Sequence, residues 1–456
     1  MNLIYGIHDR PRFGQVLLFA LQQLLAILAA TIAVPSIVGN GMSQSAALFG
    51  AGVGTIIYLL FTRFRSPVFL GSSFAFLGSM FAAFAGAVSV EAGYVGLIIG
   101  AFFAMIVYVA IAIAVKFAGV RWVNYLMPPV VIGPTVAIIG LSLAGNAIGD
   151  SLAGGFDADA GAYIMTPHLW VSFICAMVTF FVVIIVSVFG KKMMKLIPFI
   201  IGIVAGYIVA TIFTLIGNAS GNEALQIIDF SAFSNMKWMP DFTFLTAFKG
   251  LSDITGKYIA TIAVAYIPVA FVVFAEHIAD HKNLSTIVGQ DLLVDPGLHR
   301  TILGDGVGSF VGSIFGGCPN TTYGESIGCV AITKNASIVT ILTTAIIAIV
   351  ISFFGPFVTF LSTIPGCVMG GVCITLYGFI AVSGLKMLQP VDLNDNRNLF
   401  TASAILIAGI GGMVLKIGDV TLTEIACALI LGIIVNLILR KRGKAAEVDT
   451  EAEKQE

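Results

Sequence analysis

Two carboxylates stand out because they lie inside long apolar stretches of the chain. Glu276 lies in "AYIPVAFVVFAEHIADH" and Glu325 in "GGCPNTTYGESIG". A charged side chain at membrane depth is costly, so a residue of this kind is a candidate for function. Burial also favours the protonated form of a carboxyl group, which can donate as well as accept hydrogen bonds. We therefore predict that Glu276 and Glu325 bind substrate and take part in proton coupling.

The segment around Glu276 carries further ionisable residues. Asp280 follows Glu276 by four residues and shares its helix face, where it could relay protons or mark the end of the span. His277 and His281 have the same spacing, but a third metal ligand is not evident, so we expect network histidines and no metal site. For Asp305, a capping role and a functional role both stay open. We add Asp280 and His277 to the predicted proton-coupling residues and expect no cofactor besides the coupling proton.

Residues that break helices surround both candidate positions. Gly324 directly precedes Glu325, and "LGSSFAF" interrupts an apolar run near Phe74. Phe74 and Tyr323 could stack on a flat ligand, although a lone aromatic residue in a membrane core usually serves packing. A planar ligand with ring N–H donors would suit two carboxylates, backbone N–H groups and an aromatic face.

The composition places these residues in a polytopic membrane protein. The chain has 456 residues, of which 58% are hydrophobic and 10% charged, and its mean hydropathy is +1.02. An ordinary soluble domain carries roughly a quarter charged residues. Six cysteines lie in or beside apolar segments without a CxxC pair, so no disulfide or zinc framework is expected. The first apolar run shows no cleavage site, and we interpret it as the first span.

Twelve apolar runs are long enough to cross roughly 30 Å of hydrocarbon. Two interrupted stretches, 68–86 and 323–334, raise the count to fourteen segments. The predicted long runs are 14–35, 45–62, 93–117, 123–147, 168–189, 195–217, 255–280, 300–316, 337–355, 357–381, 398–416 and 421–440.

The distribution of basic residues supports the count of fourteen. With both termini in the cytoplasm, 19 Lys and Arg residues fall on the cytoplasmic side and 4 on the outside. This asymmetry agrees with the positive-inside rule, and dropping either weak segment inverts the loops that follow. Residues 441–456 form a charged tail that we expect to be disordered.

Fourteen segments divide into two halves of seven, which would have opposite orientation in the membrane. Phe74 and Gly324, at the two interruptions, are 250 residues apart, and Pro129 and Pro365 recur at a similar offset. Matched interruptions in two halves indicate the binding site of a transporter. Because lipid cannot satisfy an extended backbone, the two interruptions would pair as short antiparallel strands, each followed by a half-helix. A pair of kinked helices is the alternative.

Several motifs identify a family resemblance. "GESIGCVAITK" resembles the signature of the nucleobase–ascorbate transporters, a family of nucleobase:cation symporters, and Glu325, Gly328, Thr333 and Lys334 match its pattern. "FAEHIADH", "DPGLHRTILGDG", "GGCPNTTYGE" and "LGSSFAF" resemble the bacterial uracil permease branch, and the similarity extends from about residue 8 to about 440. Ser326 replaces the usual Asn of the signature. Asp280 stands where some uracil permeases carry His and purine-transporting relatives carry Asp.

This resemblance implies a proton-coupled uracil symporter in the bacterial inner membrane, with xanthine, urate or another purine as the alternative substrate. It implies an all-α fold of 7+7 inverted repeats with short strands in segments 3 and 10, and a homodimer in which a core domain moves against a gate domain. The core would comprise 8–118 and 250–355, and the gate 119–217 and 356–440. The substrate-binding residues implied are Glu276, Glu325, Phe74, Gly324, Tyr323, Ala30 and Tyr377.

Overall fold

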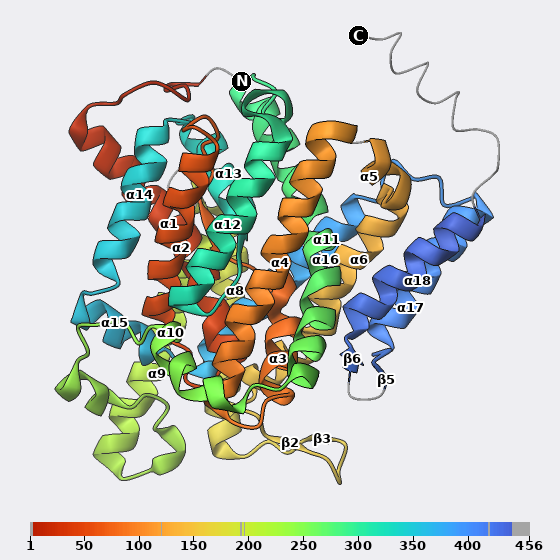
Figure 1. Cartoon of the computed structure of the whole chain (residues 1–456). Coiled ribbons are helices and arrows are strands. Elements are labelled where there is room, and N and C mark those ends of the chain that lie inside the picture. Colours follow the sequence, from red (N-terminus) through yellow and green to blue (C-terminus); the bar gives the residue numbers. More distant parts are fainter. Residues whose placement is uncertain (1–2, 120, 192–193, 196, 418–419, 440–456) are drawn as a thin grey trace.

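The computed structural model describes residues 3–119, 121–191, 194–195, 197–417 and 420–439, so the predicted tail at 441–456 lies outside the described residues. Helices dominate these parts of the chain (Figure 1). They are α1 (Phe13–Val38), α2 (Gln44–Phe61), α3 (Leu77–Ala85), α4 (Val90–Ala118), α5 (Arg121–Leu126), α6 (Pro129–Ser142), α7 (Ala144–Ser151), α8 (Pro167–Phe189), α9 (Pro198–Ser220), α10 (Thr243–Ala247), α11 (Gly256–Val288), α12 (Leu298–Gly316), α13 (Gly324–Thr333), α14 (Ile338–Ile351), α15 (Gly355–Ser362), α16 (Gly366–Lys386), α17 (Asn396–Ile410) and α18 (Glu424–Leu439).

Each predicted segment contains at least part of a helix, but the helices differ in length. Within the described residues, eight helices are long and apolar enough to cross a membrane, or nine if the bent pair α14–α15 forms one span. The chain is thus a helical, multi-pass membrane protein, and the count of fourteen stays a prediction. The single span predicted at 357–381 is wrong in its boundaries. Its first part belongs to α15, and α16 begins only at Gly366, because Pro365 caps that helix and cannot continue a preceding one.

The two interrupted segments meet as a pair of short strands, as predicted. β1 (Leu70–Ser72) runs antiparallel to β4 (Asn320–Thr322), with Gly71 opposite Thr321. The pairing satisfies backbone groups that lipid would leave without partners. β1 continues through the one-turn helix η1 (Phe74–Phe76) into α3, and β4 leads directly into α13. The expectation of two strands that each start a half-helix is therefore confirmed.

Close packing of α2 against α12 supports this strand pair. Glycines line both sides of the contact: a Cβ atom added at Gly50 would lie 2.4 Å from the carbonyl oxygen of Gly312, and one at Gly54 would lie 2.7 Å from that of Gly308. Small residues allow such close approach of helix backbones in membranes. The side-chain amide of Asn320, in β4, donates to the carbonyl oxygen of Gly50 at 3.2 Å and ties the strand to this helix pair.

The described helices pack in two neighbourhoods. α12 contacts α2 and α4, and α11 contacts α4 and α3. Elsewhere α16 contacts α6, α7 and α8, while α17 packs on α18 and α6. Figure 1 shows α17 and α18 at one flank of the molecule and α1, α2 and α14 at the other, with α11 and α16 between them. Two further antiparallel strand pairs join β2 (Phe156–Asp157) to β3 (Ala162–Tyr163) and β5 (Leu415–Ile417) to β6 (Val420–Leu422).

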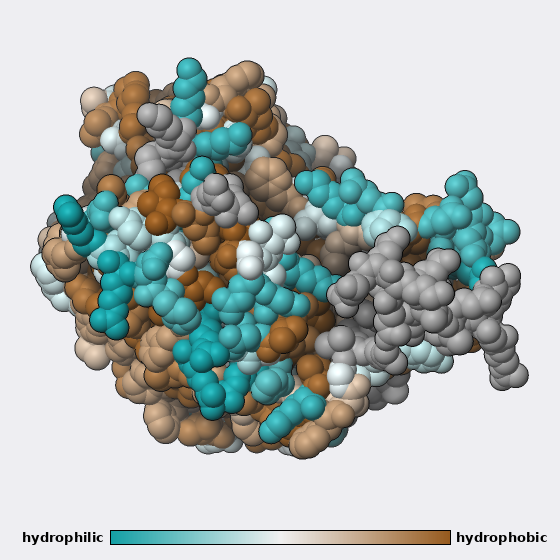
Figure 2. All heavy atoms as spheres, turned by 90° about the horizontal axis from the view of Figure 1, so that it is seen from above, coloured by the Kyte–Doolittle hydropathy of each residue, from teal (hydrophilic) through white to brown (hydrophobic). Residues whose placement is uncertain are grey.

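The surface is divided as a membrane protein requires. Viewed from one end, hydrophilic residues gather over much of that end, whereas hydrophobic residues predominate on the flanks (Figure 2). Large apolar side chains on the outer faces of α8 and α9, among them Phe181, Ile185 and Ile212, are more than half exposed. A soluble protein rarely exposes an apolar area of this extent, so these flanks face lipid.

We predict that Gly54→Ala destabilises the folded protein. The added methyl group would overlap a backbone oxygen of α12, and overpacking of this kind costs about 1–3 kcal/mol. Gly378→Ala is the matched control, because no atom lies within 4 Å of a Cβ there and Ala favours the helix. Fluorescence-detected size exclusion after heating should give a lower melting temperature for Gly54→Ala alone. Equal melting temperatures for the two variants would contradict the close packing.

Candidate functional site

A cavity of about 450 Å³ lies beside the strand pair, between the two helix neighbourhoods. Glu276, Ala279 and Asp280 come from α11, Phe74 begins η1, and Gly324 and Glu325 begin α13. The opposite wall consists of Val136 from α6, Phe199 from α9, and Leu376, Phe379, Ile380, Ser383 and Met387 from α16 and the residue that follows it.

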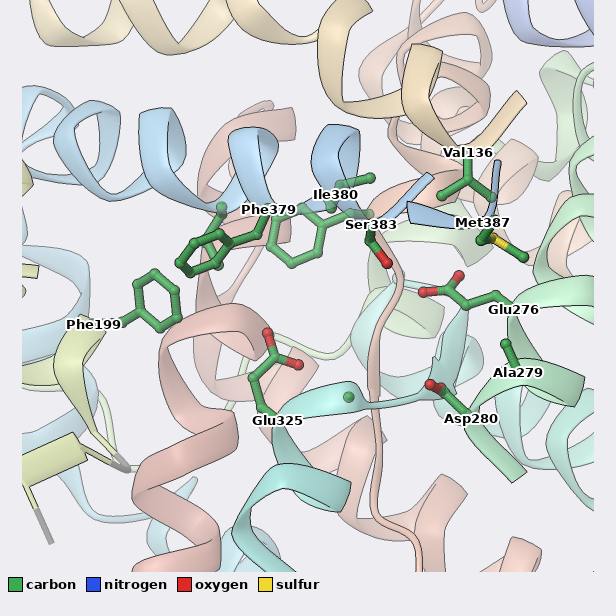
Figure 3. A pocket seen from close by; sticks show the side chains of 13 residues that line it. Val136, Phe199, Glu276, Ala279, Asp280, Glu325, Phe379, Ile380, Ser383 and Met387 are labelled. Atoms are coloured by element: carbon green, nitrogen blue, oxygen red, sulfur yellow. The ribbon is translucent and has the colours of Figure 1, made fainter. Parts of the chain in front are cut away.

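The two predicted carboxylates face this cavity from different helices. In Figure 3, the side chains of Glu276 and Glu325 both point into the open space. Within the described residues, neither has a hydrogen-bonding partner on another side chain, so their oxygens are free to meet a ligand. The structure thus brings together two residues that are 49 positions apart in the sequence, as predicted.

Asp280 lines the cavity one helical turn beyond Glu276. Its Oδ2 accepts a hydrogen bond of 2.7 Å from the hydroxyl of Thr322, the last residue of β4. Asp280 is half-buried and does not end its helix, because α11 continues to Val288. Three carboxyl groups therefore border one cavity, and no Lys or Arg is among the described residues that line it.

Two helix N-termini also point their backbone at the cavity. η1 starts at Phe74 and α13 starts at Gly324, each directly after a strand. The first N–H groups of a helix have no partner within the helix, and the helix dipole makes this end electropositive. A Cβ atom added at Gly324 would meet no atom within 4 Å, so the backbone there is open to the cavity. Phe74 and Gly324 thus lie where backbone donors could meet a ligand.

Tyr323 lies beside a second, smaller cavity of about 90 Å³ that adjoins the first. Its hydroxyl donates to the carbonyl oxygen of Ser72 at 2.7 Å. Its ring packs so closely on Gly71 that a Cβ atom there would come within 2.3 Å. Tyr323 therefore both lines the small cavity and fixes the strand pair.

Ala30 and Tyr377 are not among the described residues that line either cavity. Ala30 is buried in α1, and Tyr377 is buried in α16. The ring of Tyr377 meets that of Phe74 edge-on, with the centroids 6.3 Å apart. Tyr377 can therefore act on a ligand through the position of Phe74.

His277 belongs to a buried network behind the cavity. Its Nδ1 lies 2.8 Å from Oδ2 of Asp305, and its Nε2 lies 3.0 Å from the hydroxyl of Thr301. His281 stacks on His277 and contacts the hydroxyl of Tyr58 at 2.7 Å. Within the described residues, no group of three or more His, Cys, Asp or Glu side chains is arranged to hold a metal ion.

The apolar wall is the part of the site that the sequence reading missed. Leu376, Phe379, Ile380 and Ser383 share one face of α16, with the spacing of successive helical turns. This periodicity is visible in the sequence and predicts a helix face. It does not reveal that the face lies opposite Glu276, because that depends on how the two helix neighbourhoods are placed.

Comparisons with known proteins agree with the motifs. Residues 14–418 match the model of a permease family. A uracil permease of Bacillus caldolyticus is 41% identical over 97% of this chain and 96% of its own length, and a uracil permease of Bacillus subtilis is 38% identical over 98% and 97%. The transmembrane domain of the cyanobacterium bicarbonate transporter BicA shares the fold, with a TM-score of 0.63 at 15% identity over 96% of this chain and 99% of that one.

A cysteine introduced at Ser383 should react with a charged methanethiosulfonate reagent. Ser383 is exposed within the cavity, whereas all six native cysteines are buried and should give little background. Ser313→Cys is the matched control, because Ser313 is buried in α12. Mass spectrometry of the labelled protein measures both. Equal labelling at the two positions, or none at position 383, would contradict a solvent-filled cavity.

Proposed function

Because the chain belongs to the permease family that its residues 14–418 match, we propose that it is a uracil uptake permease of the bacterial plasma membrane. As a member of this family it is a transporter rather than an enzyme. Its near-full-length similarity to proteins named uracil permease supports uracil as the substrate.

The observation that carries the proposal is the pair of carboxylates across one cavity. Uracil is planar and has two ring N–H donors and two carbonyl acceptors. Glu276 and Glu325 supply acceptors, and the backbone N–H groups at Phe74 and Gly324 supply donors. Phe199 and Phe379 offer apolar surface to the ring faces. Few precisely placed polar groups on an apolar wall are typical of small-molecule sites.

The charge of the same cavity supports the proposal of proton coupling. Three carboxyl groups, Glu276, Asp280 and Glu325, lie together, and the lining that the structure describes contains no basic side chain. Bringing like charges together in a buried site is unfavourable, so protons would neutralise part of this charge. A proton taken up with uracil and released on the other side would couple transport to the proton gradient. His277 would influence this step only through α11, since it faces Asp305.

Alternating access would move one helix neighbourhood past the other. In this proposal the fourteen segments form 7+7 inverted repeats, with a core of 8–118 and 250–355 that carries uracil and a gate of 119–217 and 356–440. One wall of the cavity comes from the proposed core and the other from the proposed gate, which supports motion at the boundary between core and gate. We further propose that the moving unit works as an elevator within a homodimer, and that both termini are cytoplasmic.

Asp280 favours a second candidate substrate. It lines the cavity, and the family resemblance described above implies that purine-transporting relatives often carry Asp at this position. The cavity also exceeds the size of a single pyrimidine, so a xanthine or urate ring would fit beside α16. A competition panel of nucleobases separates the two candidates.

Uptake of labelled uracil into proteoliposomes tests the function. We expect accumulation that requires an inward proton gradient, collapses with a protonophore and is unaffected when sodium is replaced by choline. Unlabelled uracil should compete better than xanthine or urate. No uptake of uracil would overturn the substrate, whereas uptake that ignores the proton gradient would overturn the coupling alone.

Glu276→Gln and Glu325→Gln should each abolish uracil uptake. Glutamine cannot carry the proton, and it replaces one of the two acceptor oxygens of the carboxylate with an amide donor. Losing one good hydrogen bond in such a site costs about 1–3 kcal/mol, and more when a charged group is involved. Glu223→Gln, an exposed change in a loop, is the matched control. Initial uptake rates and uracil-induced thermal shifts measure the effect, and full uptake by either site variant would show that the pocket is misplaced.

A further inference from the structure

Ser326 is a meeting point of three segments that are far apart in the sequence. It follows Glu325 directly in the first turn of α13 and is completely buried. Its hydroxyl oxygen accepts a hydrogen bond from the backbone N–H of Phe69 at 3.1 Å and from Nε2 of Gln23 at 2.5 Å. The same amide nitrogen of Gln23 lies 3.3 Å from the carbonyl oxygen of Ser326. Helix α1, the residue before β1 and helix α13 are thereby joined.

The first turn of α13 has few other anchors. Tyr323, at the N-cap position, makes no side-chain capping bond to it. Gly324 is exposed to the cavity and would meet no atom within 4 Å even with a Cβ, and the side chain of Glu325 extends into the same space. An uncapped helix end tends to fray. The direction of Glu325 therefore depends on the buried residue that follows it.

Gln23 and Phe69 are themselves buried, at 2% and 0% exposure. The hydroxyl of Ser326 satisfies the N–H of Phe69, which directly precedes β1, and one donor of Gln23. Removal of this hydroxyl would leave buried donors without partners, which is unfavourable. The strand that delivers Phe74 to the site and the helix that delivers Glu325 thus share one small hydrogen-bonded unit.

We propose that Gln23 and Ser326 are positioning residues that hold Glu325 at the distance and angle required to bind uracil. This inference rests on the proposed function. We name this pair the Gln23–Ser326 clamp. Ser326 occupies the position at which this chain departs from the Asn of the family signature. A serine is too short to reach α1 by itself, and the longer side chain of Gln23 closes the gap.

Hydrogen exchange of the ligand-free protein tests the clamp without a substrate. Ser326→Ala and Gln23→Met should each speed exchange of the amides at 324–328, as measured by mass spectrometry. Ser337→Ala is the matched control, because its buried hydroxyl also bonds a distant backbone carbonyl, that of Asp9, at 2.7 Å. Ser337→Ala should leave exchange at 324–328 unchanged, even if it lowers the melting temperature as much as Ser326→Ala or Gln23→Met does.

Transport kinetics then test the consequence for Glu325. Each clamp variant should raise KM for uracil about tenfold with a maximal rate near that of the unmodified protein, as expected for loss of a binding contact rather than of folded protein. The effect of the double variant should be smaller than the sum of the two single effects, because both single variants remove the bond between Gln23 and the Ser326 hydroxyl. Ser337→Ala should leave KM unchanged.

These outcomes separate the clamp from the proposed function. Faster exchange at 324–328 with a raised, non-additive KM supports the clamp. Unchanged exchange, an unchanged KM, or fully additive effects would overturn it. If the unmodified protein takes up no uracil, the proposed function fails, and the exchange data still decide whether the clamp holds α13.

Discussion

A membrane interior offers no hydrogen bonds to a polypeptide backbone, and the candidate site depends on how this chain meets that constraint. Two stretches leave the helical conformation at matched places, and each would be untenable alone. They satisfy one another as β1 and β4, with Gly71 opposite Thr321. The pairing then places two new helix N-termini, at Phe74 and Gly324, beside a single cavity. The candidate site is therefore a consequence of the pairing between β1 and β4, which satisfies the backbone groups of both stretches.

Close packing around the strand pair makes this solution specific. Glycines on α2 and α12 let the two helices approach until Asn320 can bond across them, and the ring of Tyr323 covers Gly71. Ser326 joins the entry to β1 with the start of α13. Larger residues at these contacts would separate the elements that they join, so the small residues determine the geometry of the carboxylates indirectly.

The electrostatic character of the cavity follows from which elements meet there. Helix α11 brings Glu276 and Asp280, and α13 brings Glu325, whereas the facing α16 contributes chiefly apolar side chains. Acidic groups and helix N-termini are thus gathered on one wall. A wall that carries the polar groups and a wall that is largely apolar can move past one another without breaking many hydrogen bonds, and this property is compatible with the alternating access proposed above.

The sequence by itself determined the membrane class, the helical segments, the interrupted stretches and the two carboxylates. Each of these is visible either in the local hydropathy or as a polar or helix-breaking residue inside an apolar run. It also placed Phe74, Gly324 and Tyr323 near the site through the matched interruptions. Only the tertiary structure decided that His277 faces Asp305, that Ala30 and Tyr377 are not among the described residues that line the cavity, and that Phe199, Phe379 and Ser383 are. A helix shows which residues share a face, but the neighbour of that face is set by packing between segments hundreds of residues apart.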